Sequence, residues 1–433
     1  MKELKRTRRT VVKERAVLVG VVCDAEGDAH HRERLEELER LADTAGARVV
    51  GTMTQRRRRI HPGTYIGHGK VEELGSLCRS RKADVVIFEG DLTPAQVRNL
   101  EQGTGVKTLD RSELILDIFA ARARTREARL QVELAQLEYT YPRLRRMWTH
   151  LSRIEGGIGT RGPGETQLET DRRLVRKRIG DLKRRLAEID ARKEREVASR
   201  RDQLTVGLVG YTNAGKSSLL NAVTGGNVRV EDRLFATLDT RTRTWQLPHG
   251  LTALLSDTVG FIRDLPHHLV ASFKATLEEA VHADLLLHVV DASTEHMGDD
   301  LEAVEGVLAE IGCRDKPQLV VLNKVDLIED EGHLDLARRA CPDAVVVSAT
   351  RGDGLEDLAR TVLERLMGPE REVIVRADAT DGRLLAWIDR HAHVLEREVV
   401  DTTVVQTVRL PDGLVRAIDR VAEAPYTVTG TSE

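Results

Sequence analysis

One stretch of the chain has the residue types and the spacing that bind a nucleotide phosphate. The segment Gly210–Ser217, GYTNAGKS, follows an apolar run, LTVGLV, and precedes a helical pattern, SLLNAVTG. Its glycines let backbone N–H groups converge on phosphate oxygens, and the N-terminus of the following helix adds a partial positive charge. Lys216 would reach the β- and γ-phosphates, and the Ser217 hydroxyl would coordinate Mg²⁺. The segment therefore predicts a P-loop for a nucleoside triphosphate.

Three shorter motifs follow in order, each after an apolar run that predicts a strand. In DTVG, Asp257 can hold Mg²⁺ through water and Gly260 can bring its N–H to the γ-phosphate. In NKVD, Asn323 and Asp326 can read the N1–H and N2–H₂ donors of guanine, which adenine cannot match. The third motif is SAT, residues 348–350. Because ligands bind at the carboxyl ends of parallel strands, the motifs together predict one site for a guanine nucleotide.

Parallel α/β folding is the arrangement that would hold these motifs together. Apolar runs alternate with helical patterns from Leu204 to near Met367, and we expect a domain over residues 201–368. An N-terminal α/β domain with a largely parallel sheet is expected over residues 1–120, where runs such as AVLVGVV and DVVIF alternate with patterns such as RERLEELERLADTAG. Within it, residues 67–70, GHGK, resemble a fragment of a phosphate loop but have the wrong spacing, which favours a turn.

Residues 121–200 are expected to form a helical hairpin. Apolar residues recur at alternating spacings of four and three from Leu130 to Leu151, and the pattern resumes from Val175 to Ile189. Residues 156–170, GGIGTRGPGETQLET, are too rich in Gly and Pro to be helical and should join two antiparallel helices, with the glycine-rich tip at residues 156–164. Pro142 is expected to kink the first helix.

The last segment, residues 369–433, has alternating runs such as REVIVRA and DTTVVQTVRL and is expected to form a small α+β domain. The expected fold class is thus α/β and multidomain, with an N-terminal α/β domain, an antiparallel helical hairpin, a Ras-like P-loop domain and a small α+β domain. The sequence does not indicate a function for the last of these.

Charge is distributed unevenly along the chain. Residues 122–200 contain 21 lysines and arginines against 12 acidic residues, a net charge of +9, whereas the rest of the chain carries −12. This asymmetry favours RNA as the partner of the hairpin, because the RNA backbone carries closely spaced negative phosphate groups. The alternative is a solvated coiled-coil surface, which is the usual role of a run of charged residues.

Composition excludes several other classes of protein. With 433 residues, 40% hydrophobic and 32% charged, the chain is typical of a multidomain globular protein, and an aromatic share of 3% argues against an aromatic-lined groove for single strands or sugars. The four cysteines show no spacing typical of a zinc site or a disulfide framework. We read the apolar run from Ala16 to Cys23 as a strand rather than a signal peptide, and expect a cytoplasmic location and no membrane insertion.

Taken together, the motifs resemble those of one family. The order GYTNAGKS, DTVG, NKVD and SAT matches the translation-factor-related GTPases, and the segments TYIGHGKVEEL, LQVELAQLEY, GGIGTRGPGETQLETDRR and LFATLDTRTR resemble HflX, the ribosome-associated GTPase of bacteria. The resemblance covers roughly residues 50 to 366. It implies GTP hydrolysis with Mg²⁺, binding to the large ribosomal subunit through the N-terminal domain and hairpin, and splitting of stalled or idle 70S ribosomes.

The resemblance also implies three features of the site. A threonine of the first switch loop should coordinate the metal, and Thr237 matches it best, with Thr240 as the other candidate. Phe261 stands where Ras-like proteins carry a water-orienting glutamine, so intrinsic hydrolysis should be slow and a partner should complete the site. In a subset of these GTPases an asparagine placed as Asn213 helps to bind K⁺; the alternative is that Asn213 only caps the loop.

The motifs and the resemblance together predict catalytic, metal-binding, nucleotide-binding and rRNA-binding residues. The predicted catalytic residues are Lys216, Thr237, Asp257 and Gly260, and the predicted metal ligands are Ser217 and Thr237. The predicted nucleotide-binding residues are Gly210, Tyr211, Thr212, Asn213, Ala214, Gly215, Lys216, Ser217, Ser218, Asp257, Thr258, Val259, Gly260, Asn323, Lys324, Asp326, Ser348, Ala349 and Thr350. The predicted rRNA-binding residues are Gly156, Gly157, Arg161, Gly162, Gly164, Arg172, Arg173, Arg176, Lys177 and Arg178.

We expect a monomer that binds GTP or GDP and the 50S subunit with its rRNA. Two other functions remain open. One is an assembly factor that docks on the large subunit without splitting mature ribosomes, and the other is a partner of an RNA-modifying enzyme.

Overall fold

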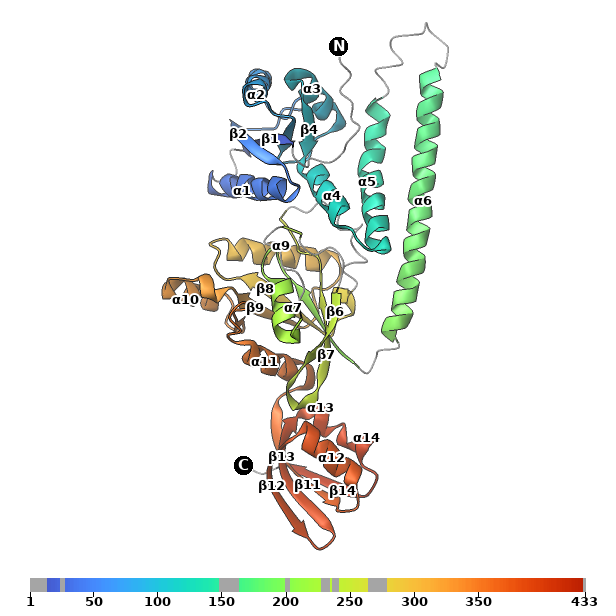
Figure 1. Ribbon diagram of the computed structural model, residues 1–433, viewed down its shortest axis with the longest axis vertical. Helices are drawn as coiled ribbons and strands as arrows, with labels where there is room; N and C mark the ends of the chain where they lie inside the picture. Colours follow the sequence, from blue (N-terminus) through green and yellow to red (C-terminus); the bar gives the residue numbers. More distant parts are fainter. Residues whose placement is uncertain are drawn as a thin grey trace. The chain divides into compact units, whose positions relative to one another are not determined.

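The structure is a computed structural model that describes residues 14–23, 28–147, 163–198, 203–226, 234–235, 241–263 and 279–430 (Figure 1). Its contacts divide the chain into two compact units. The first contains residues 1–195, 231–239 and 264–275, and the second contains residues 196–230, 240–263 and 276–433.

The first unit begins with a parallel four-stranded sheet. Its strands and helices alternate as β1 (Arg15–Cys23), α1 (Asp28–Thr44), β2 (Arg48–Arg57), α2 (His68–Arg81), β3 (Val85–Phe88), α3 (Pro94–Thr104), β4 (Lys107–Asp110) and α4 (Arg111–Arg122). The strand order is β2-β1-β3-β4, and every pairing is parallel. All four residues of β3 are buried, as expected for a central strand with helices on both faces. The N-terminal α/β fold expected from the sequence is confirmed.

One detail of that domain differs from the expectation. The segment Gly67–Lys70 is not simply a turn, because helix α2 begins at His68 and only Gly67 precedes it, as the N-cap. The three residues after Gly67 continue as helix.

The first unit also contains two long helices. Helix α5 spans Arg126–Met147 and helix α6 spans Pro163–Ala198. Their shared seam buries Leu130 and Leu134 of α5 against Leu182 and Leu186 of α6, and Figure 1 shows the two helices side by side. The heptad pattern therefore predicted the hairpin correctly.

The predicted start of the second helix was wrong. Residues 163–170 were expected in the non-helical connection, yet α6 starts at Pro163. Proline is favoured at the first position of a helix, because its missing N–H would have no partner there and its φ angle is already helical. Pro142 lies inside α5, which continues to Met147. Residues 148–162, which include most of the glycine-rich tip, lie outside the described residues.

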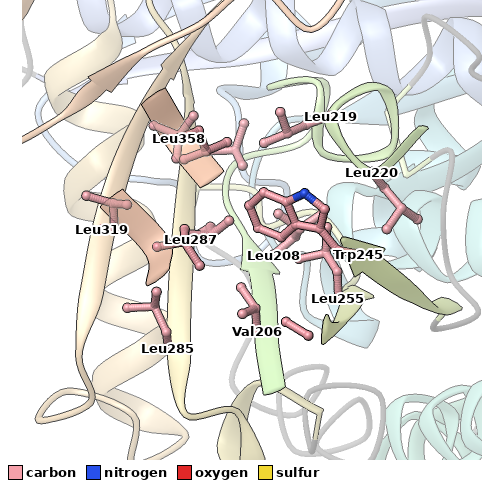
Figure 2. Packing of buried hydrophobic residues seen from close by; sticks show 14 of the residues in the cluster. Val206, Leu208, Leu219, Leu220, Trp245, Leu255, Leu285, Leu287, Leu319 and Leu358 are labelled. Atoms are coloured by element: carbon pink, nitrogen blue, oxygen red, sulfur yellow. The ribbon is translucent and has the colours of Figure 1, made fainter. Parts of the chain in front are cut away.

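The second unit contains a six-stranded sheet in the order β10-β9-β8-β5-β7-β6. Its elements are β5 (Leu204–Val209), α7 (Lys216–Thr224), β6 (Arg241–Gln246), β7 (Thr252–Asp257), β8 (Leu285–Asp291), α9 (Met297–Glu310), β9 (Gln318–Asn323), α10 (Glu331–Ala340), β10 (Val345–Val346) and α11 (Leu355–Met367), with short 3₁₀ turns at Pro248–Gly250 and Val325–Leu327. Only the β6–β7 pairing is antiparallel. Figure 2 shows the apolar core of this sheet, in which the Trp245 ring lies among Leu208, Leu220 and Leu255.

The chain ends in an antiparallel four-stranded sheet. Its elements are β11 (Glu370–Asp378), α12 (Gly382–His391), β12 (His393–Val400), β13 (Thr403–Pro411), α13 (Asp412–Val415), α14 (Ile418–Val421) and β14 (Tyr426–Gly430). The strand order β12-β13-β11-β14 is that of a ferredoxin-like split βαβ fold. This confirms the expected small α+β segment. Among the described residues, no helix has the length and hydropathy that crossing a membrane requires.

Candidate nucleotide-binding site

The P-loop connects β5 to α7, and its two outer glycines are required by the backbone. Gly210 has a φ of 151°, and a Cβ atom there would lie 2.2 Å from the carbonyl oxygen of Val289. Gly215 has a φ of 94°, and a Cβ atom there would lie 2.2 Å from Nδ2 of Asn323. Only glycine fits both the conformation and the space at these positions. The loop is therefore packed directly against strand β8 and the NKVD segment.

Lys216 is the buried cation of the site. Its Nζ donates to the carbonyl oxygens of Gly210 at 2.8 Å and Tyr211 at 2.7 Å. Burial lowers its pKa to about 8, and the positive charge of Lys324 acts in the same direction, whereas Asp257 acts against them. The ammonium group is thus held within the loop and depends on negative charge to keep its proton.

A hydroxyl and a carboxylate meet beside this lysine. Asp257 ends strand β7 and is fully buried, and its Oδ2 accepts a hydrogen bond of 2.6 Å from Ser217. Thr258, the next residue, donates from Oγ1 to the carbonyl oxygen of Leu208 at 2.6 Å. Hard oxygen ligands of this kind, few in number and next to a phosphate site, are what Mg²⁺ prefers. Ser217 and Asp257 therefore fit the metal that P-loop GTPases generally use.

The DTVG segment lies directly on the P-loop. The N–H of Thr212 donates to the carbonyl oxygen of Phe261 at 2.7 Å, and the N–H of Phe261 donates to that of Gly210 at 3.1 Å. A Cβ atom at Gly260 would lie 2.8 Å from Cγ2 of Thr212 and 3.2 Å from Nζ of Lys216. The phosphate-binding lysine and the backbone of Gly260 are therefore neighbours.

Residues after DTVG strengthen this contact. The Phe261 side chain is buried, with 2% of its surface exposed. The N–H of Arg263 donates to the Tyr211 hydroxyl at 3.1 Å, and its guanidinium pairs with Asp300 of α9 at 2.9 Å. A shift of the DTVG segment would therefore disturb contacts with both the P-loop and α9.

The NKVD and SAT segments meet at the other end of the loop. Asn323 is buried; its Nδ2 donates to the carbonyl oxygen of Ala214 at 3.0 Å, and its Oδ1 accepts from the N–H of Ala349 at 3.1 Å. Asp326 is half-buried and accepts from the Ser348 hydroxyl at 2.7 Å. Asn323 thus connects the P-loop to the SAT segment through two hydrogen bonds, a role that the sequence did not suggest.

Sequence reasoning missed two further residues of this site, Asp291 and His288, although it included Lys324. Lys324 forms a 2.7 Å ion pair with Asp291 at the end of β8. His288, three residues earlier, is buried, and burial lowers its pKa to about 4, with the charge of Lys216 adding to the effect. The signal was present in the run LLLHVVD, where a histidine and a terminal aspartate interrupt an apolar strand.

Most of the predicted nucleotide-binding residues come together in the second unit, since the P-loop, DTVG, NKVD and SAT segments contact one another there. Thr237 and Thr240 lie outside the described residues. Phe235, two residues before Thr237, is buried in the first unit, where its ring packs edge-on against Phe119 of α4 at a centroid distance of 4.6 Å.

The predicted rRNA-binding residues are only partly described. Gly156, Gly157, Arg161 and Gly162 lie outside the described residues, and Gly164 belongs to α6. On α6, Arg178 forms a bidentate ion pair with Glu133 of α5, and Arg176 donates a hydrogen bond to the Tyr141 hydroxyl. Arg173 and Lys177, one helical turn apart, are exposed, whereas Arg172 is half-buried.

A mainly parallel sheet carrying these four motifs at one edge defines the class of protein as a P-loop GTPase. Three family models match the chain: "GTP-binding GTPase N-terminal" over residues 32–120, "GTP-binding GTPase Middle Region" over 122–200 and "50S ribosome-binding GTPase" over 205–324. Together with the relatives described next, they show that the chain belongs to the HflX family of GTPases.

Curated relatives match most of the chain. It is 47% identical to GTPase HflX of Caldanaerobacter subterraneus subsp. tengcongensis over 84% of this chain and 82% of the relative. It is 45% identical to GTPase HflX of Escherichia coli over 92% and 94%, respectively. Among solved structures, a GTP-binding protein from Sulfolobus solfataricus in complex with GDP is 25% identical, with a TM-score of 0.44 over 81% of this chain and 98% of that one.

Proposed function

We propose that this GTPase binds the large ribosomal subunit in its GTP-bound state, splits stalled or idle 70S ribosomes, and is released when GTP is hydrolysed. The observation that carries the proposal is the contact of Gly260 with Lys216 and the P-loop, because it couples the phosphate site to the DTVG segment. The match to a family described as a 50S ribosome-binding GTPase supplies the partner. We propose a monomer that acts in the cytoplasm.

Each residue of the phosphate site would have a separate role. Lys216 would hold the β- and γ-phosphates, and Gly260 would donate its N–H to the γ-phosphate. Ser217 and Thr237 would hold Mg²⁺, with Asp257 acting through water; the metal would neutralise charge that develops on the phosphates. Guanine specificity would rest on Asp326, while Asn323, whose amide already bonds two backbone groups, would fix the loops around the base.

Hydrolysis should need a second component. Phe261 has no hydrogen-bonding side chain and is buried, so it cannot orient an attacking water molecule. We propose that the ribosome completes the site, and that the GTPase rate of the isolated protein is low. Purified 50S subunits should raise that rate, and an unchanged rate would remove this part of the proposal.

Asn213 supports a further cofactor, K⁺. Its side chain is exposed and its backbone has a left-handed φ of 65°, a conformation that asparagine tolerates. We propose that it helps to hold K⁺ beside the phosphates. GTP turnover should then be faster in KCl than in NaCl, and equal rates would leave Asn213 with a loop-capping role only.

The hairpin supplies the RNA contact in this proposal. Exposed Arg173 and Lys177 are available to phosphates, whereas Arg178 and Arg176 hold α6 against α5. The glycine-rich tip would approach RNA where side chains would clash. Deleting residues 156–164 should abolish splitting without changing GTP binding.

A sucrose gradient tests splitting directly. The 70S peak should decrease when the protein is added with a non-hydrolysable GTP analogue, and it should not change with a Lys216→Ala variant. If the wild-type protein co-sediments with 50S subunits but leaves the 70S peak intact, the assembly-factor function is correct instead.

A further inference from the structure

An ion pair lies at the rim of the nucleotide site, between the ends of two neighbouring strands. Asp291 ends β8 and Lys324 follows β9, and the two strands pair in parallel so that Asp291 lies opposite Asn323. The N–H of Ala292 donates to the carbonyl oxygen of Asn323 at 2.9 Å. Oδ2 of Asp291 lies 2.7 Å from Nζ of Lys324. None of the roles proposed for the P-loop, DTVG and NKVD segments uses the carboxylate of Asp291.

The carboxylate of Asp291 has a fixed orientation. Its Oδ1 accepts from the N–H of Ser293 at 3.0 Å and from the Ser293 hydroxyl at 2.6 Å. The other oxygen, Oδ2, pairs with Lys324, so each oxygen has its own partner. A lysine is otherwise a flexible point charge on a four-carbon stem. The ion pair with a fixed carboxylate therefore fixes the position of the Lys324 ammonium group.

Burial makes this pair stronger than an ion pair on the surface. The side chains of Asp291 and Lys324 are 21% and 22% exposed, whereas those of Asp357 and Arg360 on α11, an ion pair in solvent, are 65% and 70% exposed. Water and salt screen a partly buried pair less than an exposed one. A lysine also loses conformational entropy when it becomes ordered at a binding site. Because Asp291 orders Lys324 before a ligand arrives, nucleotide binding does not include that loss.

The stem of Lys324 lies beside the P-loop. A Cβ atom at Gly215 would lie 3.9 Å from Cε of Lys324. The residue two positions after Lys324 is Asp326, which would read the edge of guanine. The methylene groups of a lysine form an apolar surface even when its ammonium group is charged, and the flat face of a base can pack against such a surface. The stem is therefore placed to contact the base that Asp326 would read.

The ion pair also separates the roles of two lysines. Burial lowers the pKa of Lys216 to about 8, and the charge of Lys324 adds to this effect, so the two ammonium groups interact. The negative charge of Asp291 offsets that of the Lys324 ammonium at the rim. Lys216 is then the cation that meets the phosphates, and Lys324 contributes through its stem.

We propose that Asp291 is a positioning residue for the guanine base: it holds the ammonium group of Lys324 so that the stem forms one wall of the base pocket and aligns the base with Asp326. Asp291 itself would touch neither the base nor the phosphates. The inference rests on the proposed role of Asp326 in reading guanine. It adds to the site a specificity-determining residue from β8, a strand that carries none of the four motifs.

The test variant is Asp291→Asn, and its control is Asp284→Asn. Asp284 precedes the opposite end of β8, and its Oδ2 accepts from the N–H and the hydroxyl of Thr205 at 2.8 and 2.7 Å, as Asp291 accepts from Ser293. The measurements are the affinities for GDP and for inosine diphosphate, IDP, which lacks the 2-amino group of guanine, and KM and kcat for GTP. Thermal unfolding first confirms that both variants are folded.

Asp291→Asn should weaken GDP binding about tenfold, because Lys324 is no longer ordered in advance. IDP binding should weaken less, so the preference for GDP over IDP should shrink. KM for GTP should rise by a similar factor while kcat changes less than about twofold, because the phosphates keep their contacts. Asp291→Glu, which keeps the charge, should restore most of the affinity. Adding Lys324→Met to Asp291→Asn should weaken binding no further, because the two residues act as a unit.

The control Asp284→Asn should match the wild type. Equal GDP affinity for Asp291→Asn and Asp284→Asn would overturn the inference. An equal loss of GDP and IDP affinity would also overturn it, since the base would not then be misaligned at Asp326. In both cases the proposed role of Asp326 stands if Asp326→Ala abolishes the preference of the wild type for GDP. A wild type that binds GDP and IDP equally well would overturn that role and this inference together.

Discussion

At the scale of single residues, the nucleotide site depends on polar groups that are buried and bonded to the backbone. That Lys216, Ser217, Asp257 and Gly260 lie together could be predicted from the sequence, because the P-loop and DTVG are contiguous motifs with a known spacing. The hydrogen bonds of Asn323 could not be predicted, because their partners, Ala214 and Ala349, lie 109 and 26 residues away along the chain. Sequence spacing does not predict which loops approach one another after folding.

The lowered pKa of Lys216 predicts a pH-dependent affinity for nucleotide. In the free protein the ammonium loses its proton as the pH rises through about 8. Phosphate charge favours the protonated form and raises this pKa, so binding should take up protons near and above pH 8, and affinity for GDP should fall as the pH rises. Calorimetry at pH 8.5 in buffers of different ionisation enthalpy measures the uptake. A binding enthalpy that does not depend on the buffer would contradict the prediction.

Replacing Asn323 should destabilise the protein as well as the site. Asn323→Ala leaves the carbonyl oxygen of Ala214 and the N–H of Ala349 without their partner, and each unsatisfied buried group costs about 1–3 kcal/mol. We expect the free energy of unfolding to fall by about 2–4 kcal/mol, measured by urea denaturation. Unchanged stability with weaker guanine binding would show that Asn323 acts on the base alone.

At the scale of elements, a buried carboxylate fastens the hairpin to the N-terminal sheet. Asp110 ends β4 and is fully buried; its carboxylate accepts from the Tyr139 hydroxyl at 2.6 Å and from Arg143 at 2.9 Å, both on α5. It also caps α4 by accepting from the N–H of Glu113. The heptad pattern predicted α5 and its seam, but not this attachment, because a polar contact across 29 residues leaves no periodic signal.

Removing Asp110 should therefore loosen α5 from the sheet. Asp110→Ala leaves a buried hydroxyl and a largely buried guanidinium without their acceptor, and breaking such a pair costs about 3–5 kcal/mol. Asp84→Ala, at an exposed aspartate before β3, is the control and should cost far less. Chemical denaturation measures both variants, and equal losses would contradict a fastening role for Asp110.

The start of α6 shows the limit of composition as a signal. The segment after Pro163 was expected to be non-helical because glycine and proline accumulate before it, yet a single proline at a first helical position favours a helix. The preference of proline for the first position of a helix therefore predicts the start of α6 better than the glycine and proline content of the segment does.

At the scale of the whole molecule, the proposed function requires the nucleotide site to communicate with the surfaces that would bind the ribosome. Fold class and family could be predicted from the sequence, because each element has a clear pattern and the four motifs occur in a fixed order. The placement of Phe235 in the first unit could not be predicted, because this residue lies between α7 and β6 in the chain. Phe235 lies two residues before Thr237, the predicted switch residue, so its aromatic contact with Phe119 would link a first switch loop to helix α4.

Phe119→Leu tests that link. It removes an edge-on aromatic pair, worth about 0.5–1.5 kcal/mol, while keeping an apolar side chain of similar size. Affinity for GTP should stay unchanged, but the difference in 50S binding between GTP analogue and GDP should shrink. Phe88→Leu removes the comparable pair with Tyr65 and should leave that difference intact. Equal effects of the two variants would contradict a coupling role.

In the proposed function, the bound nucleotide decides whether the protein stays on the large subunit. The most direct measurement is the affinity of the full chain for purified 50S subunits, determined in parallel with a non-hydrolysable GTP analogue and with GDP. The proposed function predicts binding at least about tenfold tighter with the analogue, a coupling of about 1.4 kcal/mol or more. Equal affinity in the two nucleotide states would contradict it.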